Sequence, residues 1–224
     1  ERSSLVAKRR KARGRYVLDG TIIKPKEAND VWTADFKGWW RMQNGEICYP
    51  LTIRDEYSRY VINLSAHKSP SFPTVKRQFK QCFEKYGLPK YIRTDNGGPF
   101  AAMYALHGLS QLSAWWISIG IFPNRTKPAS PYMNGAHERM HRDIKHDLQR
   151  APERNILSQQ KVFDKWVLYF NSERPHQALN MKTPNESYVE SARSYDPIEP
   201  EYQYSSKFEI RKVDCRGHIY WKNN

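Results

Sequence analysis

The first half of the chain switches between segments with strand periodicity and segments with helix periodicity. Apolar side chains at every second position predict a strand that ends near Asp35, and two more strands within residues 46–67 around a turn at residues 55–58. Residues 71–87 then place apolar side chains at helical spacing, and the final glycine, followed by Leu-Pro, ends this helix. The pattern therefore predicts three strands followed by a helix.

The second half of the chain continues with alternating helices and strands. In chain order we expect a strand that runs into a turn (89–100), a helix bent near Gly108 (103–120), a brief strand (121–128), a helix capped by Asn134, and an amphipathic helix that ends at Arg174-Pro175 (159–175). Strands first, then alternating helices and strands, predict an α/β layered core.

The two ends of the chain differ from this core. Six basic residues fall within positions 8–15 without an apolar face, which is typical of a solvated linker. Prolines punctuate the sequence after about residue 191, and residues 208–221 then alternate like a β-hairpin. We therefore expect a basic linker over residues 1–28, a core over residues 29–190, and a further linker with the start of a small β segment over residues 191–224.

Composition and charge narrow the class of protein. The chain has 224 residues, of which 39% are hydrophobic, and its 37 Lys and Arg against 23 Asp and Glu give a net charge of +14. Such a surplus favours a polyanionic partner, above all nucleic acid. No apolar run approaches the roughly 18–20 residues that cross a bilayer, so we expect no membrane partner. The three cysteines contain no C-x-x-C pair, which argues against a disulfide framework or a cysteine zinc site and suggests a reducing cytoplasm.

Three acidic residues stand where an α/β core exposes side chains for chemistry. Asp35 ends the first predicted strand, Asp95 ends the strand before the Asp-Asn-Gly-Gly turn, and Glu138 lies in the first turns of a helix. Carboxylates are hard oxygen ligands that suit Mg²⁺ or Mn²⁺, and three that converge would repel one another without a cation. Two such ions about 4 Å apart support phosphodiester displacement. If the three residues meet in space, they predict a metal-dependent nuclease or transferase.

The helix that carries Glu138 has two unlike faces. At about 100° per residue, Ala136, Met140, Ile144 and Leu148 form an apolar stripe. Glu138 shares the nearly opposite face with Arg142, Lys145 and Gln149. A carboxylate followed by cations along one helix face suits a metal ion beside a phosphate backbone.

The same helix also contains the pattern H-E-x-x-H at residues 137–141, which in metalloproteases holds catalytic zinc. A zinc protease remains an alternative, but it needs a third protein ligand downstream. His146 is only five residues beyond His141, and Glu153 follows a break at Ala151-Pro152. We therefore interpret His137 as a packing residue within the apolar arc.

Four segments in order resemble the catalytic core of the retroviral-integrase superfamily, and more closely the bacterial insertion-sequence transposases of the integrase-like type. They are "VWTADFKG", "RTDNGGPF", "SPYMNGAHERMHRDIK" and "NSERPHQALNMKTP", which together fall within residues 29–188. The resemblance implies a ribonuclease-H-like fold, with a five-stranded mixed sheet flanked by helices. It also implies an Asp-Asp-Glu triad that binds two Mg²⁺ (or Mn²⁺) ions, matched here by Asp35, Asp95 and Glu138.

The resemblance also implies how DNA would be held. Asn134 would shape the loop ahead of the helix, while Arg142 and Lys145 match basic positions that touch donor DNA. Lys127 and the basic cluster of residues 8–15 are further candidates for phosphate contacts. We expect a transposase or integrase that cleaves DNA ends and joins them to a target, acting as a homo-oligomer on DNA in the bacterial cytoplasm. The alternative within the same fold is a DNA-binding protein without catalytic activity.

Overall fold

A computed structural model describes residues 22–102, 108–126 and 135–198 of the chain, together with residues 206, 209 and 211. The basic run at residues 8–15 lies outside the described residues, as do Lys127 and Asn134. Of the hairpin predicted for residues 208–221, only residues 209 and 211 are described. The predictions for these residues stay predictions.

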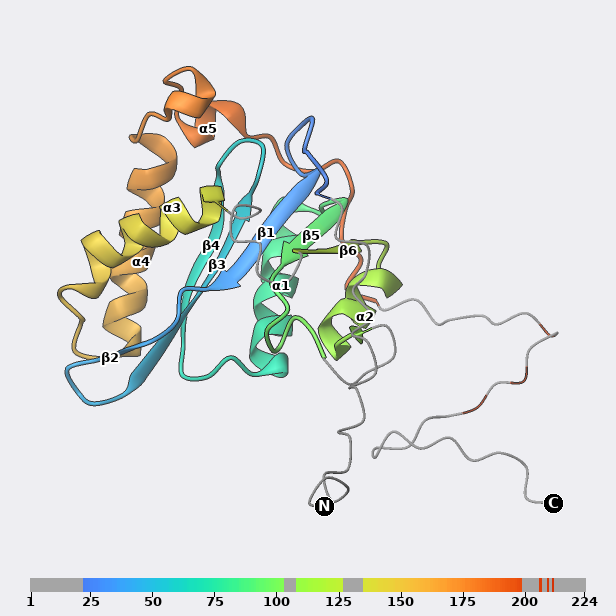
Figure 1. The fold of residues 1–224 in the computed structure, drawn as a ribbon, viewed down its shortest axis with the longest axis horizontal. Coiled ribbons are helices and arrows are strands. Elements are labelled where there is room, and N and C mark those ends of the chain that lie inside the picture. The colour runs from blue at the N-terminus through green and yellow to red at the C-terminus, as the bar shows by residue number, and fades with distance from the viewer. Residues whose placement is uncertain are drawn as a thin grey trace, which may run out of the picture.

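A mixed sheet forms the centre of the molecule (Figure 1). Its strands are β1 (Val31–Phe36), β2 (Trp40–Arg41), β3 (Ile47–Asp55), β4 (Val61–His67), β5 (Tyr91–Thr94) and β6 (Phe122–Arg125). Strand β1 pairs antiparallel with β3 on one side and parallel with β5 on the other. Strand β4 then pairs antiparallel with β3, and β6 pairs parallel with β5. The predicted five-stranded mixed sheet is confirmed, and the two-residue β2 beside one end of β3 adds a short strand that alternation did not predict.

Helices cover both faces of this sheet. They are α1 (Phe72–Tyr86), α2 (Gln111–Ser118), α3 (Gly135–Ile144), which continues as a π-helical turn (Lys145–Gln149), α4 (Ile156–Ser172), a 3₁₀ turn (Gln177–Leu179) and α5 (Pro184–Ser187). Figure 1 shows α1 and α2 on one side of the sheet and α3 and α4 on the other. The α/β prediction is confirmed, although α4 begins three residues earlier and ends two residues before the expected Arg174-Pro175 boundary.

Two apolar clusters hold the layers together, one on each face of the sheet. The first joins β1 and β3 to α1 and α2 through side chains such as Trp32, Phe79 and Trp116, all 0% exposed. The second joins α3 and α4 to β2 and β4 through residues such as Met140 and Phe163. In the part of the chain that the structure describes, no helix has both the length and the apolar character to cross a membrane.

The ends of the described core reach slightly beyond residues 29–190. Ahead of the core, the backbone carbonyl of Ile23 accepts a hydrogen bond from the Arg93 side chain. Beyond it, the Arg193 guanidinium donates to the carbonyls of Pro89 and Gly120 at 2.7 and 2.6 Å, and Tyr195 packs against the first apolar cluster. These contacts attach both flanking segments to the edge of the sheet near β5 and β6.

Candidate functional site

The faces of the central strands are unlike, and this difference positions the site. Along β1 the side chains of Trp32 and Ala34 join the apolar cluster beneath α1 and α2. Thr33 and Asp35 alternate with them and therefore point to the opposite face, where α3 lies. Thr52 of β3 stands opposite Asp35 in the antiparallel register. The centre of the α3-facing side is therefore polar, and the helix must bring polar groups to it.

Asp35 occupies the fifth position of β1, one residue before the strand ends. Its side chain is 26% exposed. Burial, then the negative charge of Asp95 and, to a smaller extent, that of Glu138 together raise the pKa of this carboxyl from 3.8 to about 7. Both effects disfavour the ionised form. The Asp35 carboxylate therefore interacts electrostatically with both other acidic residues of the predicted triad.

Asp95 follows β5 directly and is exposed. Because β1 and β5 run parallel, with Thr33 paired to Arg93, Asp35 and Asp95 come two residues later at the same edge of the sheet. The backbone N–H of Gly97 donates to Oδ1 of Asp95 at 3.0 Å. A Cβ at position 97 would lie 3.0 Å from Oδ2 of the same carboxylate, so glycine leaves room for it.

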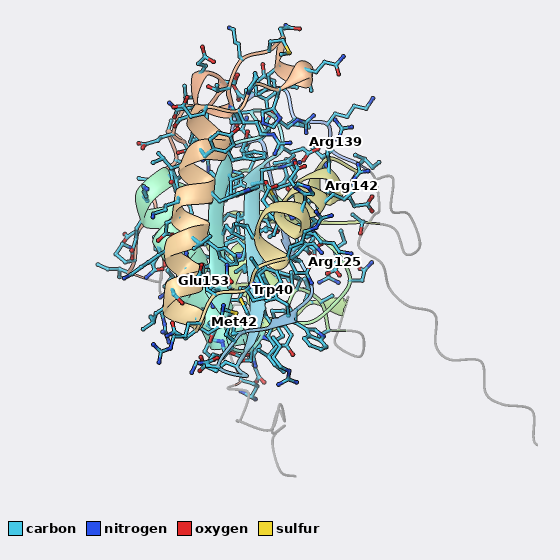
Figure 2. The ribbon with its side chains drawn as sticks, turned by 90° about the vertical axis from the view of Figure 1, so that its left-hand side faces the viewer. Trp40, Met42, Arg125, Arg139, Arg142 and Glu153 are labelled. Atoms are coloured by element: carbon cyan, nitrogen blue, oxygen red, sulfur yellow. The ribbon has the colours of Figure 1, made fainter. Side chains whose placement is uncertain are left out.

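Glu138 lies in the first turn of α3 and is exposed. It shares the outer side of the helix with exposed Arg142 and Lys145, while Met140 and Ile144 are buried, as the helical periodicity predicted. The side view in Figure 2 shows α3 alongside the strands, with Arg139 and Arg142 on it. Glu138 therefore reaches the site from a different layer than the two aspartates.

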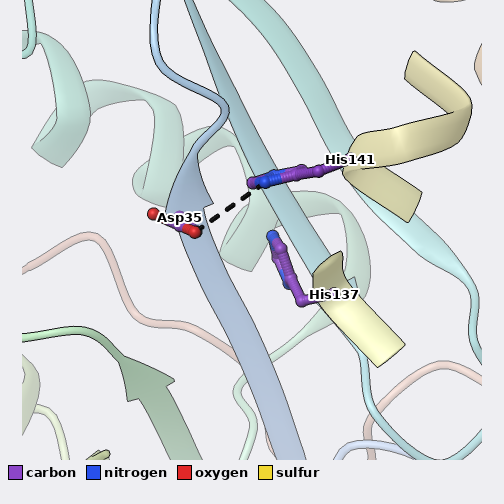
Figure 3. Close-up of side chains that lie close together, drawn as sticks. All are labelled: Asp35, His137 and His141. Atoms are coloured by element: carbon purple, nitrogen blue, oxygen red, sulfur yellow. Dashed lines mark ion pairs between the residues drawn. The ribbon is translucent and has the colours of Figure 1, made fainter. Parts of the chain in front are cut away.

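The closest set of potential metal ligands differs from the acidic trio. Within the described residues, the group of three whose ligand atoms all lie within 4.8 Å of one another is Asp35, His137 and His141 (Figure 3). Asp95 and Glu138 influence Asp35 by charge but do not join so tight a group. The edge of the sheet is thus acidic on its open side and is backed by two imidazoles.

Both histidines are held by the polar face of the sheet. His137 is 0% exposed, with Nδ1 at 2.8 Å from Oγ1 of Thr33 and Nε2 at 2.6 Å from Oγ1 of Thr52. His141 places Nε2 at 2.9 Å from the same Thr52 oxygen. Burial lowers the pKa of His137 well below 6.5 and that of His141 to about 3, so both rings are neutral near pH 7.

The contacts of the two histidines argue against a zinc-protease role for the H-E-x-x-H pattern. A zinc protease would use one nitrogen of each histidine, whereas both nitrogens of His137 lie within hydrogen-bond distance of threonine hydroxyls. The expectation that His137 packs in the interior is confirmed, although burial is complete and polar contacts hold the ring. The pattern comes from two histidines that dock α3 on the sheet.

A basic residue that the sequence analysis did not single out also lies at the site. Lys37 follows β1 two residues after Asp35 and is half-buried. Burial and then the charge of Lys145 lower the pKa of Lys37, while the charge of Asp35 raises it. Lys37 and Lys145 are thus close enough to repel one another beside the carboxylates. In the sequence, the position of Lys37 only two residues after Asp35 was the signal that could have identified it as a site residue.

Comparison with known protein families gives a consistent result. Two family profiles, each described as "Integrase core domain", match residues 25–131 and residues 119–184. Together they span the sheet, the three acidic residues and helix α4.

Curated relatives come from bacterial insertion elements. An uncharacterized 31.7 kDa protein of insertion element IS407 from Burkholderia multivorans is 25% identical over 182 residues, covering 81% of this chain and 63% of the relative. The transposase for insertion sequence element IS904 from Lactococcus lactis is 24% identical over 173 residues, covering 75% of this chain and 65% of the relative. The chain therefore spans less than two thirds of the length of these relatives.

Solved structures share the fold. The catalytic core domain of HTLV-2 integrase, solved in complex with magnesium, superimposes with a TM-score of 0.52 at 17% identity over 74% of this chain and 100% of that chain. The simian T-cell lymphotropic virus intasome gives a TM-score of 0.57 at 18% identity over 89% of this chain and 66% of that chain. At this identity the likeness concerns the fold, and the predicted ribonuclease-H-like architecture is confirmed.

Proposed function

Because residues 25–184 match the integrase core domain and the chain therefore belongs to that family, we propose that it is a DNA transposase or integrase. In this proposal it cleaves DNA at the ends of a mobile element and joins the freed 3′ ends to target DNA. The observation that carries the proposal is the parallel register of β1 and β5, which brings Asp35 and Asp95 to one edge of the sheet, where the charge of Glu138 also acts on Asp35. Three separate segments of the chain supply these groups.

The donor set at this edge fits divalent metal ions. Carboxylate oxygens suit Mg²⁺ and Mn²⁺, and the pKa of Asp35 is raised because burial and the charges of Asp95 and Glu138 outweigh the charge of Lys37, so a bound cation would favour the ionised carboxylate. Asp35, Asp95 and Glu138 would hold the ions. When bound, two such ions supply Lewis-acid activation of an attacking oxygen and stabilisation of a leaving oxygen. Two ions, rather than one, are part of the proposal.

The chain's own basic residues would hold the DNA backbone next to these carboxylates. Arg142 of α3 and Lys145 of the π-helical turn that continues it are exposed on the same side as Glu138, and Lys37 lies beside Asp35. Contacts of this kind fix the register of the duplex without reading its sequence, and they weaken as salt rises. Lys127 and Asn134 belong to the same proposal on the strength of the sequence resemblance.

The partners follow from this chemistry. The substrates would be the two ends of a mobile element and a target DNA, which together favour a homo-oligomer that holds paired ends. Structures of HTLV-2 integrase in dimeric and trimeric forms support such assembly for this fold. With insertion-element relatives in bacteria, we propose that the protein acts in the bacterial cytoplasm.

A strand-transfer assay tests the proposal against a DNA-binding protein without activity. The full chain is incubated with Mg²⁺ or Mn²⁺, a supercoiled plasmid and a labelled duplex that copies the ends of the element around the gene. The proposal predicts labelled plasmid products, their loss in Asp95→Asn, and their retention in Asp164→Asn, an exposed acid on α4. DNA binding without joining would support the inactive alternative, and joining by Asp95→Asn at the parent rate would refute the triad.

A further inference from the structure

Three polar groups surround one buried hydroxyl, and their chemistry fixes where its proton goes. Oγ1 of Thr52 lies 2.8 Å from the backbone carbonyl oxygen of Asp35, 2.6 Å from Nε2 of His137 and 2.9 Å from Nε2 of His141. A carbonyl oxygen can only accept, so the single hydroxyl proton of Thr52 is donated to Asp35. Both imidazoles must then donate their Nε2–H to the oxygen of Thr52.

This assignment leaves the two Nδ1 atoms as acceptors with different surroundings. Nδ1 of His137 lies 2.8 Å from Oγ1 of Thr33 and accepts its hydroxyl proton, since the other acceptor of that hydroxyl, the Arg54 carbonyl, is farther away at 3.4 Å. Nδ1 of His141 instead lies 3.9 Å from Oδ2 of Asp35, a separation too long for a hydrogen bond. The dashed line in Figure 3 joins these two side chains. His141 therefore presents a lone pair toward the carboxylate.

The separation of the two atoms suits a shared cation. Metal–nitrogen and metal–oxygen bonds to small divalent ions are each about 2.0–2.1 Å, so two ligands of one ion are at most about 4.2 Å apart. The 3.9 Å between Nδ1 of His141 and Oδ2 of Asp35 falls within this limit. The His141 side chain is 13% exposed and its Nε2 is held by Thr52, so the orientation of the ring is fixed with Nδ1 on the side of Asp35.

We propose that His141 is a nitrogen ligand to the cation held by Asp35, so that this end of the site is a mixed nitrogen–oxygen site. The inference rests on the proposed function, since it concerns the same acidic edge. Imidazole favours Mn²⁺ and Zn²⁺ over Mg²⁺, which prefers oxygen alone. The site therefore prefers Mn²⁺ to Mg²⁺, and Zn²⁺ competes with both. His137 supports His141 through Thr52 but does not bind the ion.

Pulsed electron paramagnetic resonance of bound Mn²⁺ tests this inference directly. Spin-echo modulation from ¹⁴N detects an imidazole nitrogen coordinated to Mn²⁺, and the unaltered full chain without DNA is the sample. We expect nitrogen modulation in the parent chain, its loss in both His141→Asn and His141→Gln, and its retention in His146→Gln, which alters an exposed histidine of the same helical segment. Mn²⁺ affinity should fall at least about tenfold in the His141 variants, with Mg²⁺ affinity changed far less.

The outcomes separate this inference from the proposed function. Mn²⁺ that binds in an Asp35-dependent manner without nitrogen modulation in the parent chain overturns the role of His141 and leaves the acidic site intact. Absence of any Mn²⁺ binding overturns both. Because the parent spectrum alone decides the first question, the test does not depend on whether a His141 variant folds. Circular dichroism melting of each variant shows whether a lost signal reflects coordination or unfolding.

Discussion

Oγ1 of Thr52 lies 2.6 Å from Nε2 of His137, and this contact joins strand β3 to the first turn of α3. His137 precedes Glu138 in the chain, so the hydrogen bond that anchors the helix also sets the position of the third acidic residue. The two side chains are 0% exposed. A buried polar contact thus links the sheet that carries Asp35 to the helix that carries Glu138.

Replacing Thr52 with valine tests this link. Thr52→Val keeps the shape but removes the hydroxyl partner of Nε2 in both His137 and His141, which should cost about 1–3 kcal/mol in the free energy of unfolding. We expect DNA joining to fall more than DNA affinity, because Glu138 loses its anchor. Urea denaturation measures the first effect and end-labelled DNA titration the second. Ser118→Ala, at an exposed residue of α2 whose hydroxyl bonds the backbone carbonyl of Trp115 in the same helix, should change stability by less than about 0.5 kcal/mol. An equally small effect at Thr52 would contradict the link.

Asp35 should weaken the metal-free fold when it is ionised. Its pKa is raised from 3.8 to about 7, so the unfolded chain gives up this proton more readily, and the folded state loses stability as pH rises through that range. Asp35→Asn should therefore raise the free energy of unfolding by about 1–2 kcal/mol at about pH 8 in a chelator, after allowance for solvent screening.

Added Mg²⁺ should reverse this order. Saturating metal stabilises a chain that binds it by about 1–3 kcal/mol, and only the parent chain retains the Asp35 ligand. Denaturation with and without Mg²⁺ compares the two proteins. A parent chain more stable than Asp35→Asn in chelator, or equal Mg²⁺ stabilisation of both, would count against the acidic site.

His67 should make stability depend on pH on the acid side. Burial, and then the charge of Arg77, lowers its pKa from 6.5 to about 4. The folded-state pKa is below the unfolded value, so the unfolded chain takes up the proton first and stability is lost as pH falls from about 6.5 to 4. His67→Gln, which can keep the contact with Oγ of Ser65, should flatten this decline in urea midpoints. An identical slope in His67→Gln and the parent chain would refute the assignment, and His146→Gln serves as the exposed control.

The periodicity of the chain was sufficient to predict the main strands and helices, and the physical reason is plain at particular residues. Met140 and Ile144 are buried because a helix places them on one stripe, and Trp32 is buried because a strand alternates. The positions of Asp35, Asp95 and Glu138 at element ends also followed from this pattern. Their assignment as a triad came from the resemblance, and remains a proposal.

Other features depend on tertiary contacts that periodicity cannot supply. Thr33 and Thr52 are polar positions in buried strands, but nothing local shows that one pair of histidines from 85 to 104 residues away covers them. The two-residue β2 forms only because β3 is long enough to pair beyond β1. Likewise, the closeness of Lys37 to Lys145 depends on how α3 docks.

Lys145 should contribute to DNA affinity without regard to sequence. Its charge is exposed near Lys37 and the acidic edge, where a phosphate would relieve the repulsion between the two lysines. Lys145→Ala should weaken binding to unrelated duplexes alike and reduce the slope of log affinity against log salt by about 1. Lys165→Ala, at an exposed lysine on α4, should leave the slope unchanged. A loss confined to one DNA sequence would indicate base recognition instead.

The most direct measurement is an anomalous-scattering map from crystals of the chain soaked in Mn²⁺. We expect manganese at the edge of the sheet where β1 and β5 end, with carboxylate oxygens of Asp35 and at least one of Asp95 and Glu138 within about 2.3 Å of an ion. Manganese bound elsewhere, or an edge without manganese at saturating concentration, would contradict the shared metal site from which the proposed DNA chemistry follows.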